Sequence, residues 1–187
     1  MNPLRYLRYF PTAIVIPGAF ALATFAFPFL AGLSYWPVIL VGIAAVVGQF
    51  VKPYRHFMYG TLSPAVVLQI KPLILAVYTD LSDNHRLSVP VVKIVRHPRL
   101  RSDRFAIGQR CVTVSLYQPY DGFRERQKWK DFEPLLVSVA TSDPAISSNA
   151  LRCLPDDDWF MLEQFVLQLP KPPSLGLHQF APNLQRN

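Results

Sequence analysis

Cysteine is scarce in this sequence, which contains two among 187 residues, Cys111 and Cys153. They lie far apart and show no spacing typical of a zinc site. A disulfide framework and a cysteine-based metal centre are therefore excluded as organising features of the fold. We expect both cysteines to be reduced thiols in the core of a domain that faces the cytosol.

Catalytic motifs are missing as well. The sequence contains no hydrolase nucleophile motif, no phosphate-binding glycine-rich loop and no dinucleotide fingerprint. None of its four histidines has a ligand-like partner at helical or turn spacing: His56, His85, His97 and His178. The sequence therefore predicts a protein that is not an enzyme and that uses no cofactor and no metal.

Three weaker readings of polar residues remain open beside this one. His56 follows the apolar region and could ligate a haem or chlorophyll, although a place among lipid headgroups suits it better. Asp80 and Asp83 could bind a cation, but Asx side chains more often cap turns. Asp156–Asp158 look like a metal cluster, yet successive helical residues point in different directions, and carboxylates also stabilise the first turn of a helix.

Charged side chains are absent from residues 12–51, a stretch about twice as long as one membrane-spanning helix. This run predicts two transmembrane helices, at 12–31 and 36–51, joined by a turn at 32–35. The alternatives are a cleaved signal peptide, a re-entrant hairpin that enters and leaves the same membrane face, and a buried hairpin in the core of a soluble protein.

The residues that flank this run set its predicted orientation. Arg5 and Arg8 precede it, Lys52 and Arg55 follow it, and the turn between the two helices has no Lys or Arg. The positive-inside rule therefore places both termini on the cytoplasmic side of an inner, plasma or thylakoid-type membrane.

Positive charge is concentrated between Lys93 and Lys130. Ten Lys and Arg stand against three acidic residues in this window, a net charge of +7 that equals the net charge of the whole chain. Two predicted loops, 96–104 and 124–130, carry most of it. The candidate binding residues for anionic lipid, another polyanion or a protein partner are Arg96, Arg99, Arg101, Arg104, Arg124, Arg126, Lys128, Trp129 and Lys130.

The region after the apolar run reads as one small domain of strands followed by helices. Short runs of alternating or β-branched residues predict five strands, at 64–68, 73–78, 89–95, 111–117 and 135–139. Asp143-Pro144 predicts a short helix to about residue 151. A second helix begins near Pro155, buries Trp159, Leu162, Val166 and Leu169, and ends at Pro170.

These elements favour a mainly-β small barrel of the OB or SH3-like kind with a C-terminal helix packed on it. The predicted organisation is a basic flank at 1–11, two transmembrane helices within 12–51, a barrel domain at 58–170 and a proline-rich extended tail at 171–187.

Several segments of this domain resemble the DUF3239 family of bacterial proteins across roughly residues 58–177. The segments that carry the resemblance are 60–67, 75–82, 91–95, 108–112, 116–117 and 155–159. The resemblance implies a bacterial or cyanobacterial source and a small β domain. It implies no catalytic residue, because the family has no assigned chemistry. In plan, a membrane hairpin followed by a small barrel is also similar to the NfeD-type membrane proteins, which act as partners of other membrane proteins.

Two functions follow from these patterns as expectations. The first is a non-catalytic, membrane-anchored accessory, scaffold or assembly subunit of a larger membrane protein complex. The alternative is a module that binds anionic lipid or another polyanion on the cytoplasmic face through loops 96–104 and 124–130. Nucleic acid is disfavoured as a ligand, because few aromatic side chains accompany the basic residues and a membrane anchor is unusual for that task.

Overall fold

The computed structural model describes residues 36–82, 88–97, 105–119 and 129–180, together with the short helical pieces 18–19 and 22–23. The chain divides into two compact units, Met1–Tyr59 and Gly60–Asn187.

The first unit contains the helix α3, Trp36–Tyr59. This helix covers the second predicted transmembrane segment, 36–51, and continues to Tyr59. Within the ranges that the structure describes, no helix is both long and apolar enough to cross a membrane. Most of the first predicted segment, 12–31, and the turn at 32–35 lie outside the described residues. The transmembrane hairpin therefore stays a prediction.

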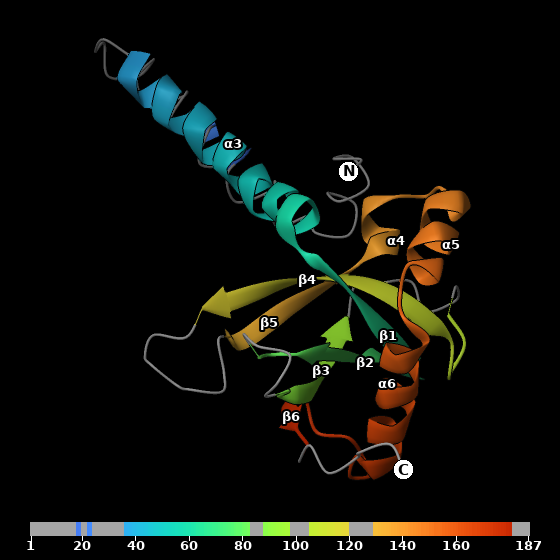
Figure 1. The fold of residues 1–187 in the computed structure, drawn as a ribbon. Coiled ribbons are helices and arrows are strands. Elements are labelled where there is room, and N and C mark those ends of the chain that lie inside the picture. The colour runs from blue at the N-terminus through green and yellow to red at the C-terminus, as the bar shows by residue number, and fades with distance from the viewer. Residues whose placement is uncertain are drawn as a thin grey trace. The chain divides into compact units, whose positions relative to one another are not determined.

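The second unit is a curled sheet of six antiparallel strands that forms a half-barrel (Figure 1). The strands are β1 (Thr61–Gln69), β2 (Leu73–Asp80), β3 (Pro90–His97), β4 (Arg110–Pro119), β5 (Trp129–Leu136) and β6 (Gly176–Gln179). Their order in the sheet is β5-β4-β1-β2-β3-β6. Strands β4-β1-β2-β3 form a Greek key, in which β4 returns to pair with β1. The first four predicted strands are confirmed by β1 to β4.

The fifth predicted strand, at 135–139, is wrong in position. The strand β5 ends at Leu136, and residues Val137–Ala140 form the short helix α4. Alternating Leu135, Val137 and Val139 suggested a strand, but Val137 and Ala140 are also spaced to face one side of a helical turn, and both are buried. The true strand has the charged residues Lys130, Asp131 and Glu133 among its aromatic and apolar ones and contains Pro134, which is tolerated because β5 is an edge strand.

Apolar side chains of the strands fill the inner side of the curl. Paired residues on antiparallel strands point to the same face, so the register places Val67, Leu75, Phe132 and Leu136 with the rest of this inner set. All four are at most 1% exposed. The half-barrel therefore has a core made of its own side chains.

The helix α6, Asp156–Gln168, packs on the outer face of β1, β2 and β3. Its buried residues are Trp159, Leu162 and Phe165, and the ring of Phe165 lies 5.8 Å from that of Tyr78 on β2. The predicted helix is confirmed, but its buried stripe runs through Phe165, whereas Val166 is only half-buried. Phe165 and Val166 are neighbours on the helix near its sheet-facing side, and the Phe165 ring occupies the interface with the sheet.

The helix α5, Pro144–Arg152, lies against β4. It begins as the sequence predicts: the Asp143 carboxylate accepts a hydrogen bond from the Ala145 N–H at 2.8 Å, and Pro144 occupies the first turn. One predicted core position is wrong, because Cys153 at the end of α5 is exposed.

Part of the predicted extended tail belongs to the sheet. Strand β6 pairs with β3 from Gly176 to Gln179, and the Phe180 ring stacks on Phe165 at 4.2 Å. This segment therefore covers the edge of β3 inside the molecule. Residues 181–187 lie outside the described part of the chain.

Side chains draw β3 and β5 together across the open side of the half-barrel. The Lys93 Nζ on β3 donates to both carboxylate oxygens of Asp131, at 2.8 and 2.7 Å, and to the Phe132 carbonyl at 2.6 Å. At the start of β5, the Trp129 N–H donates to the Leu81 carbonyl at 3.3 Å. We call the contacts of Lys93 with Asp131 and Phe132 the lysine clasp.

Candidate functional site

Three of the nine predicted binding residues fall within the described ranges. Arg96 is exposed near the end of β3, Lys130 is exposed near the start of β5, and Trp129 is half-buried. The remaining predicted residues lie outside the described part of the chain: Arg99, Arg101, Arg104, Arg124, Arg126 and Lys128.

The two basic loops connect to opposite ends of β4. Residues 98–109 precede β4, which begins at Arg110, and residues 120–128 follow it after Pro119. A strand of ten residues is about 30 Å long, so the two points of attachment are well separated. The end that carries residues 120–128 is also the end where β1 starts, because Thr61 pairs with Ser115. That both loops form one basic patch stays a prediction, because most of their basic residues lie outside the described part of the chain.

Trp129 is part of the aromatic packing of the barrel. Its ring lies 5.4 Å from the Tyr117 ring, which in turn lies 6.3 Å from Phe132. A β-bulge near Gln118 and Pro119 allows this, because it places Trp129 and Phe132 on the same face as Tyr117 although they are three residues apart. The indole is therefore a structural side chain of the inner face.

Asp80 caps the turn that follows β2. Its Oδ1 accepts hydrogen bonds from the Ser82 and Val89 N–H groups, at 2.8 and 2.9 Å, and its Oδ2 accepts from the Ser88 hydroxyl at 2.6 Å. The turn role expected for this aspartate is confirmed. Burial by itself would raise the pKa of Asp80, but these hydrogen bonds outweigh it and lower that pKa below the usual value.

An acidic group on α6 shares the same end of the sheet. The pKa of Asp158 is raised, chiefly by burial and then by the charges of Asp157 and Asp80. Tyr78 has a raised pKa as well, because it is buried and faces Asp158 and Asp80. Among the residues that the structure describes, no three His, Cys, Asp or Glu side chains gather as they would around a metal ion.

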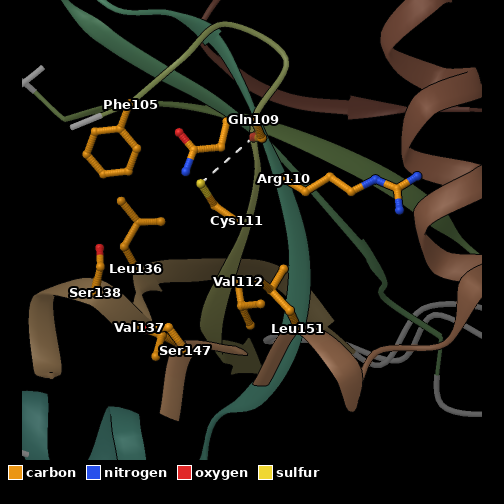
Figure 2. Close-up of a pocket in the computed structure, with 10 residues that line it drawn as sticks. All are labelled: Phe105, Gln109, Arg110, Cys111, Val112, Leu136, Val137, Ser138, Ser147 and Leu151. Atoms are coloured by element: carbon orange, nitrogen blue, oxygen red, sulfur yellow. Dashed lines mark hydrogen bonds between the residues drawn. The ribbon is translucent and has the colours of Figure 1, made fainter. Parts of the chain in front are cut away.

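A small open pocket lies between the start of β4, the end of β5 and the helices α4 and α5 (Figure 2). Its volume is about 130 Å³. The residues that line it are Phe105, Gln109, Arg110, Cys111, Val112, Leu136, Val137, Ser138, Ser147 and Leu151. Sequence analysis missed this pocket, because its walls come from four separate segments of the chain.

The walls of the pocket are mostly apolar. The Cys111 thiol donates a weak hydrogen bond to the Gln109 carbonyl at 3.8 Å. Burial raises the pKa of Cys111 to about 11, so this group is a neutral thiol at physiological pH and a poor nucleophile. The neighbouring Arg110 is bound elsewhere: its guanidinium contacts the Glu163 carboxylate at 2.7 Å and lies over the Trp159 ring. The pocket is thus electrically neutral and suited to an apolar group.

The fold is similar to that of a solved structure. A crystal structure of a protein from Corynebacterium diphtheriae, described as a putative membrane protein, matches 64% of this chain and 100% of its own with a TM-score of 0.54. The sequence identity is 16%, so this likeness shows the fold alone. No curated protein of known function matches the chain.

The family comparison agrees with the resemblance seen in the sequence. Residues 48–169 match the family described as "Protein of unknown function (DUF3239)". The match begins inside α3, continues through β1 to β5 and ends just after α6. The chain therefore belongs to the DUF3239 family.

Proposed function

We propose that this protein is a non-catalytic, membrane-anchored accessory or scaffold subunit of a larger membrane protein complex. Residues 12–51 form the anchor in this proposal, with both termini on the cytoplasmic side. The barrel is of the OB kind, in which a Greek key is extended by a fifth strand and β3 approaches β5. The description of the C. diphtheriae fold relative as a membrane protein supports the anchor.

The observation that carries this proposal is the way apolar side chains are distributed over the second unit. The inside of the curl is filled by side chains such as Leu75, Val77 and Phe132, each fully buried. Large apolar side chains remain on the outside, where Ile107 is 69% exposed and Leu167 is 73% exposed. A filled interior, with apolar side chains such as these left exposed, is compatible with a domain that contacts other proteins through its surface.

Purification of the whole chain in fixed stoichiometry with other proteins tests this function. A tag on the protein in its own cells, followed by extraction in mild detergent, is expected to isolate a constant set of membrane proteins. Replacing residues 12–51 by an unrelated membrane hairpin should weaken that association, because small residues in the run suit close helix packing. A protein that purifies alone, accompanied by lipid only, would contradict the proposal.

Binding of anionic lipid remains a second candidate, and the chain topology favours one loop for it. Residues 120–128 leave β4 at the end where β1 starts, and only Gly60 separates β1 from α3. Lys130 is exposed beside this loop. Each Lys or Arg near an anionic membrane contributes about 1 kcal/mol. We therefore test residues 120–128, the loop that joins β4 to β5, as the lipid-binding segment.

Matched loop variants test this alternative. Replacing Arg124, Arg126 and Lys128 by Gln is expected to reduce the binding of this loop to phosphatidylserine, measured with the full chain and phosphatidylserine nanodiscs. The same replacement at Arg99, Arg101 and Arg104 is the control, because those residues precede the far end of β4. Equal effects of the two sets, or none, would count against lipid binding by this loop.

A further inference from the structure

We infer that the segment 174–180 is a displaceable strand, and that the groove it occupies also receives an extended segment of a partner protein that carries an aromatic residue. The groove consists of the edge of β3 at residues 90–94 and the Phe165 ring of α6. We call it the tail groove. This inference rests on the proposed function, since it names the kind of segment that the accessory subunit holds.

Main-chain hydrogen bonds hold the segment in the tail groove. β6 pairs with β3 from Gly176 to Gln179 at the edge of the sheet, and the Phe180 N–H donates to the Pro90 carbonyl at 3.3 Å (Figure 1). Successive residues of an antiparallel strand turn their N–H and C=O groups to opposite sides. Because the Phe180 N–H faces β3, the main-chain groups of His178 face β3 as well, whereas those of Gln179 face away. Such a ladder requires an extended main chain and no particular side chain, so another segment can form it too.

One aromatic side chain anchors the segment. The Phe180 ring stacks on the Phe165 ring, with 4.2 Å between the ring centres and an interplanar angle of 18°. Phe165 is 1% exposed, and its ring lies 5.8 Å from that of Tyr78. Phe180 therefore extends an aromatic cluster that begins in the core. A strand added at a sheet edge, with one side chain held in a specific place, is the arrangement of β-augmentation.

The segment itself lies outside the core of the domain. Among the residues that the structure describes, none that follows Leu169 is buried. The family match ends at residue 169 as well. Short, partly exposed end segments open at much lower free energy than the whole domain. The segment can therefore leave the tail groove while the half-barrel stays folded.

Its departure would define what the groove can bind. The edge of β3 would present unpaired N–H and C=O groups, which accept another strand, and Phe165 would lose its stacked partner. Residues 174–180 contain no charged side chain. The recognition depends on the main chain and one ring, so the partner segment that fits is extended, uncharged along the ladder and aromatic at the position of Phe180.

A fluorescent peptide with the sequence of residues 174–180, capped at both ends, tests the inference on the full chain in phosphatidylcholine nanodiscs. The protein variant Phe180→Ala weakens the resident segment and leaves the tail groove intact, so it should bind the peptide about tenfold or more tightly than the unmodified chain. Gln179→Ala, which alters an exposed side chain, is the matched control and should leave the affinity unchanged.

A second variant releases the segment without altering its anchor. Gly176 has a φ of 118°, which valine strongly disfavours, so Gly176→Val should increase the affinity for the peptide as Phe180→Ala does. Both variants change residues that are not buried, and circular dichroism checks that they are folded. Unchanged affinity in both variants would overturn the inference.

Modified peptides test the mode of binding. An N-methyl group at His178 of the peptide removes a main-chain donor that faces β3, whereas an N-methyl group at Gln179 removes one that faces away. The first peptide, and a peptide with Phe180→Ala, should bind about tenfold more weakly, while the second should bind nearly as the parent does. Added salt should change none of these affinities, because no charge takes part. Equal weakening by the two N-methyl groups would overturn strand addition.

The oligomeric state identifies the occupant. Light scattering in mild detergent should give the same mass for the unmodified chain and for Phe180→Ala. A dimer that Phe180→Ala dissociates would show the segment of a second copy in the tail groove and overturn the partner inference. Peptide binding does not depend on co-purification. A constant set of co-purifying proteins without peptide binding would therefore contradict this inference alone, and peptide binding by a protein that purifies alone would contradict only the proposed function.

Discussion

Hydroxyl groups line part of the inner face of the curled sheet. Ser63, Thr79, Thr113 and Ser115 are all less than 10% exposed, and Tyr117 is half-buried beside them. Thr79 and Tyr117 hydrogen-bond each other across β1, and the Thr113 hydroxyl donates to the Ser63 carbonyl at 3.1 Å. Among the residues that the structure describes, the hydroxyl oxygen of Ser115 has no hydrogen-bond partner. A buried polar group without a partner costs about 1–3 kcal/mol of folding free energy.

Neighbouring hydroxyls should therefore respond oppositely to removal. Ser115→Ala deletes a buried oxygen without a partner, so we expect the free energy of unfolding to stay equal or rise by about 1 kcal/mol. Thr113→Val keeps the shape of the side chain but deletes a hydrogen-bonded hydroxyl, so the free energy of unfolding should fall by about 1 kcal/mol. Urea unfolding of the two variants measures the difference. A loss of stability in Ser115→Ala as large as that in Thr113→Val would contradict this assignment.

Two aspartates at one end of the sheet should give stability opposite dependences on pH. The pKa of Asp80 is lowered by folding, so its contribution is present above its ordinary value of 3.8 and is lost as pH falls through the folded pKa. The pKa of Asp158 is raised, so its ionised form opposes folding at neutral pH and this cost disappears on acidification.

Asparagine at each position separates these effects. Asp80→Asn should lower the unfolding temperature at pH 7 and flatten its decline below about pH 4. Asp158→Asn should raise the unfolding temperature at pH 7, with a gain that shrinks as the pH falls toward the raised pKa. Thermal unfolding from pH 3 to 7 provides the measurement. Shifts of the unfolding temperature of the same sign in both variants would contradict the opposite effects of Asp80 and Asp158 on stability.

At the scale of elements, the lysine clasp joins β3 and β5, two strands that do not pair with each other through the main chain. The side chain of Lys93 is 18% exposed and that of Asp131 33%, so the pair is partly shielded from water. The lysine also satisfies the Phe132 carbonyl and lies 5.5 Å from the centre of that ring. The Lys93 side chain thus donates to a main-chain carbonyl and to a carboxylate of β5.

Loss of the clasp should weaken the barrel. Lys93→Met keeps most of the aliphatic stem but removes the lysine donor from the Phe132 carbonyl and from the Asp131 carboxylate, which keeps the Phe132 N–H as a donor at 2.7 Å, and we expect a cost of about 2–4 kcal/mol. Lys130→Met removes an exposed lysine two residues before Phe132 and should change stability by less than about 0.5 kcal/mol. Equal denaturant midpoints for the two variants would mean that the clasp does not hold β3 to β5.

The elements differ in how far sequence patterns could predict them. Alternation and β-branching located β1 to β4, because each buries apolar side chains on at least one face. β5 lies earlier than the predicted strand, since charged residues interrupt the alternation in its first part and its end leads into a buried helix. β6 could not be recognised among prolines, because four residues become a strand only when β3 offers an edge.

The candidate sites show the same division between local pattern and tertiary arrangement. Charge counting found both basic loops, but only the strand order shows that they leave β4 at opposite ends. The pocket had no pattern of its own, because Cys111 and Ser147 meet through the packing of α5 on β4. Spatial sites of this kind require the fold.

At the scale of the whole molecule, the second unit should fold without the first. Every buried apolar residue in the described part of the chain, from Ala65 to Leu169, lies within Gly60–Asn187. A fragment beginning at Gly60 is therefore expected to unfold cooperatively and to keep the near-ultraviolet circular dichroism of its packed aromatic rings. A non-cooperative transition with strong binding of a hydrophobic dye would show that residues 1–59 are needed for the packed state.

The position of β1 also has a mechanical consequence. This strand follows α3 after a single residue and is paired on both sides, with β2 and with β4. A pull on an edge strand can peel one ladder of hydrogen bonds at a time, whereas a pull that reaches the barrel through Gly60 meets two ladders at once. Tension that reaches the second unit through Gly60 would thus be shared across the middle of the sheet, and the edges carrying β5 and β6 would bear little of it.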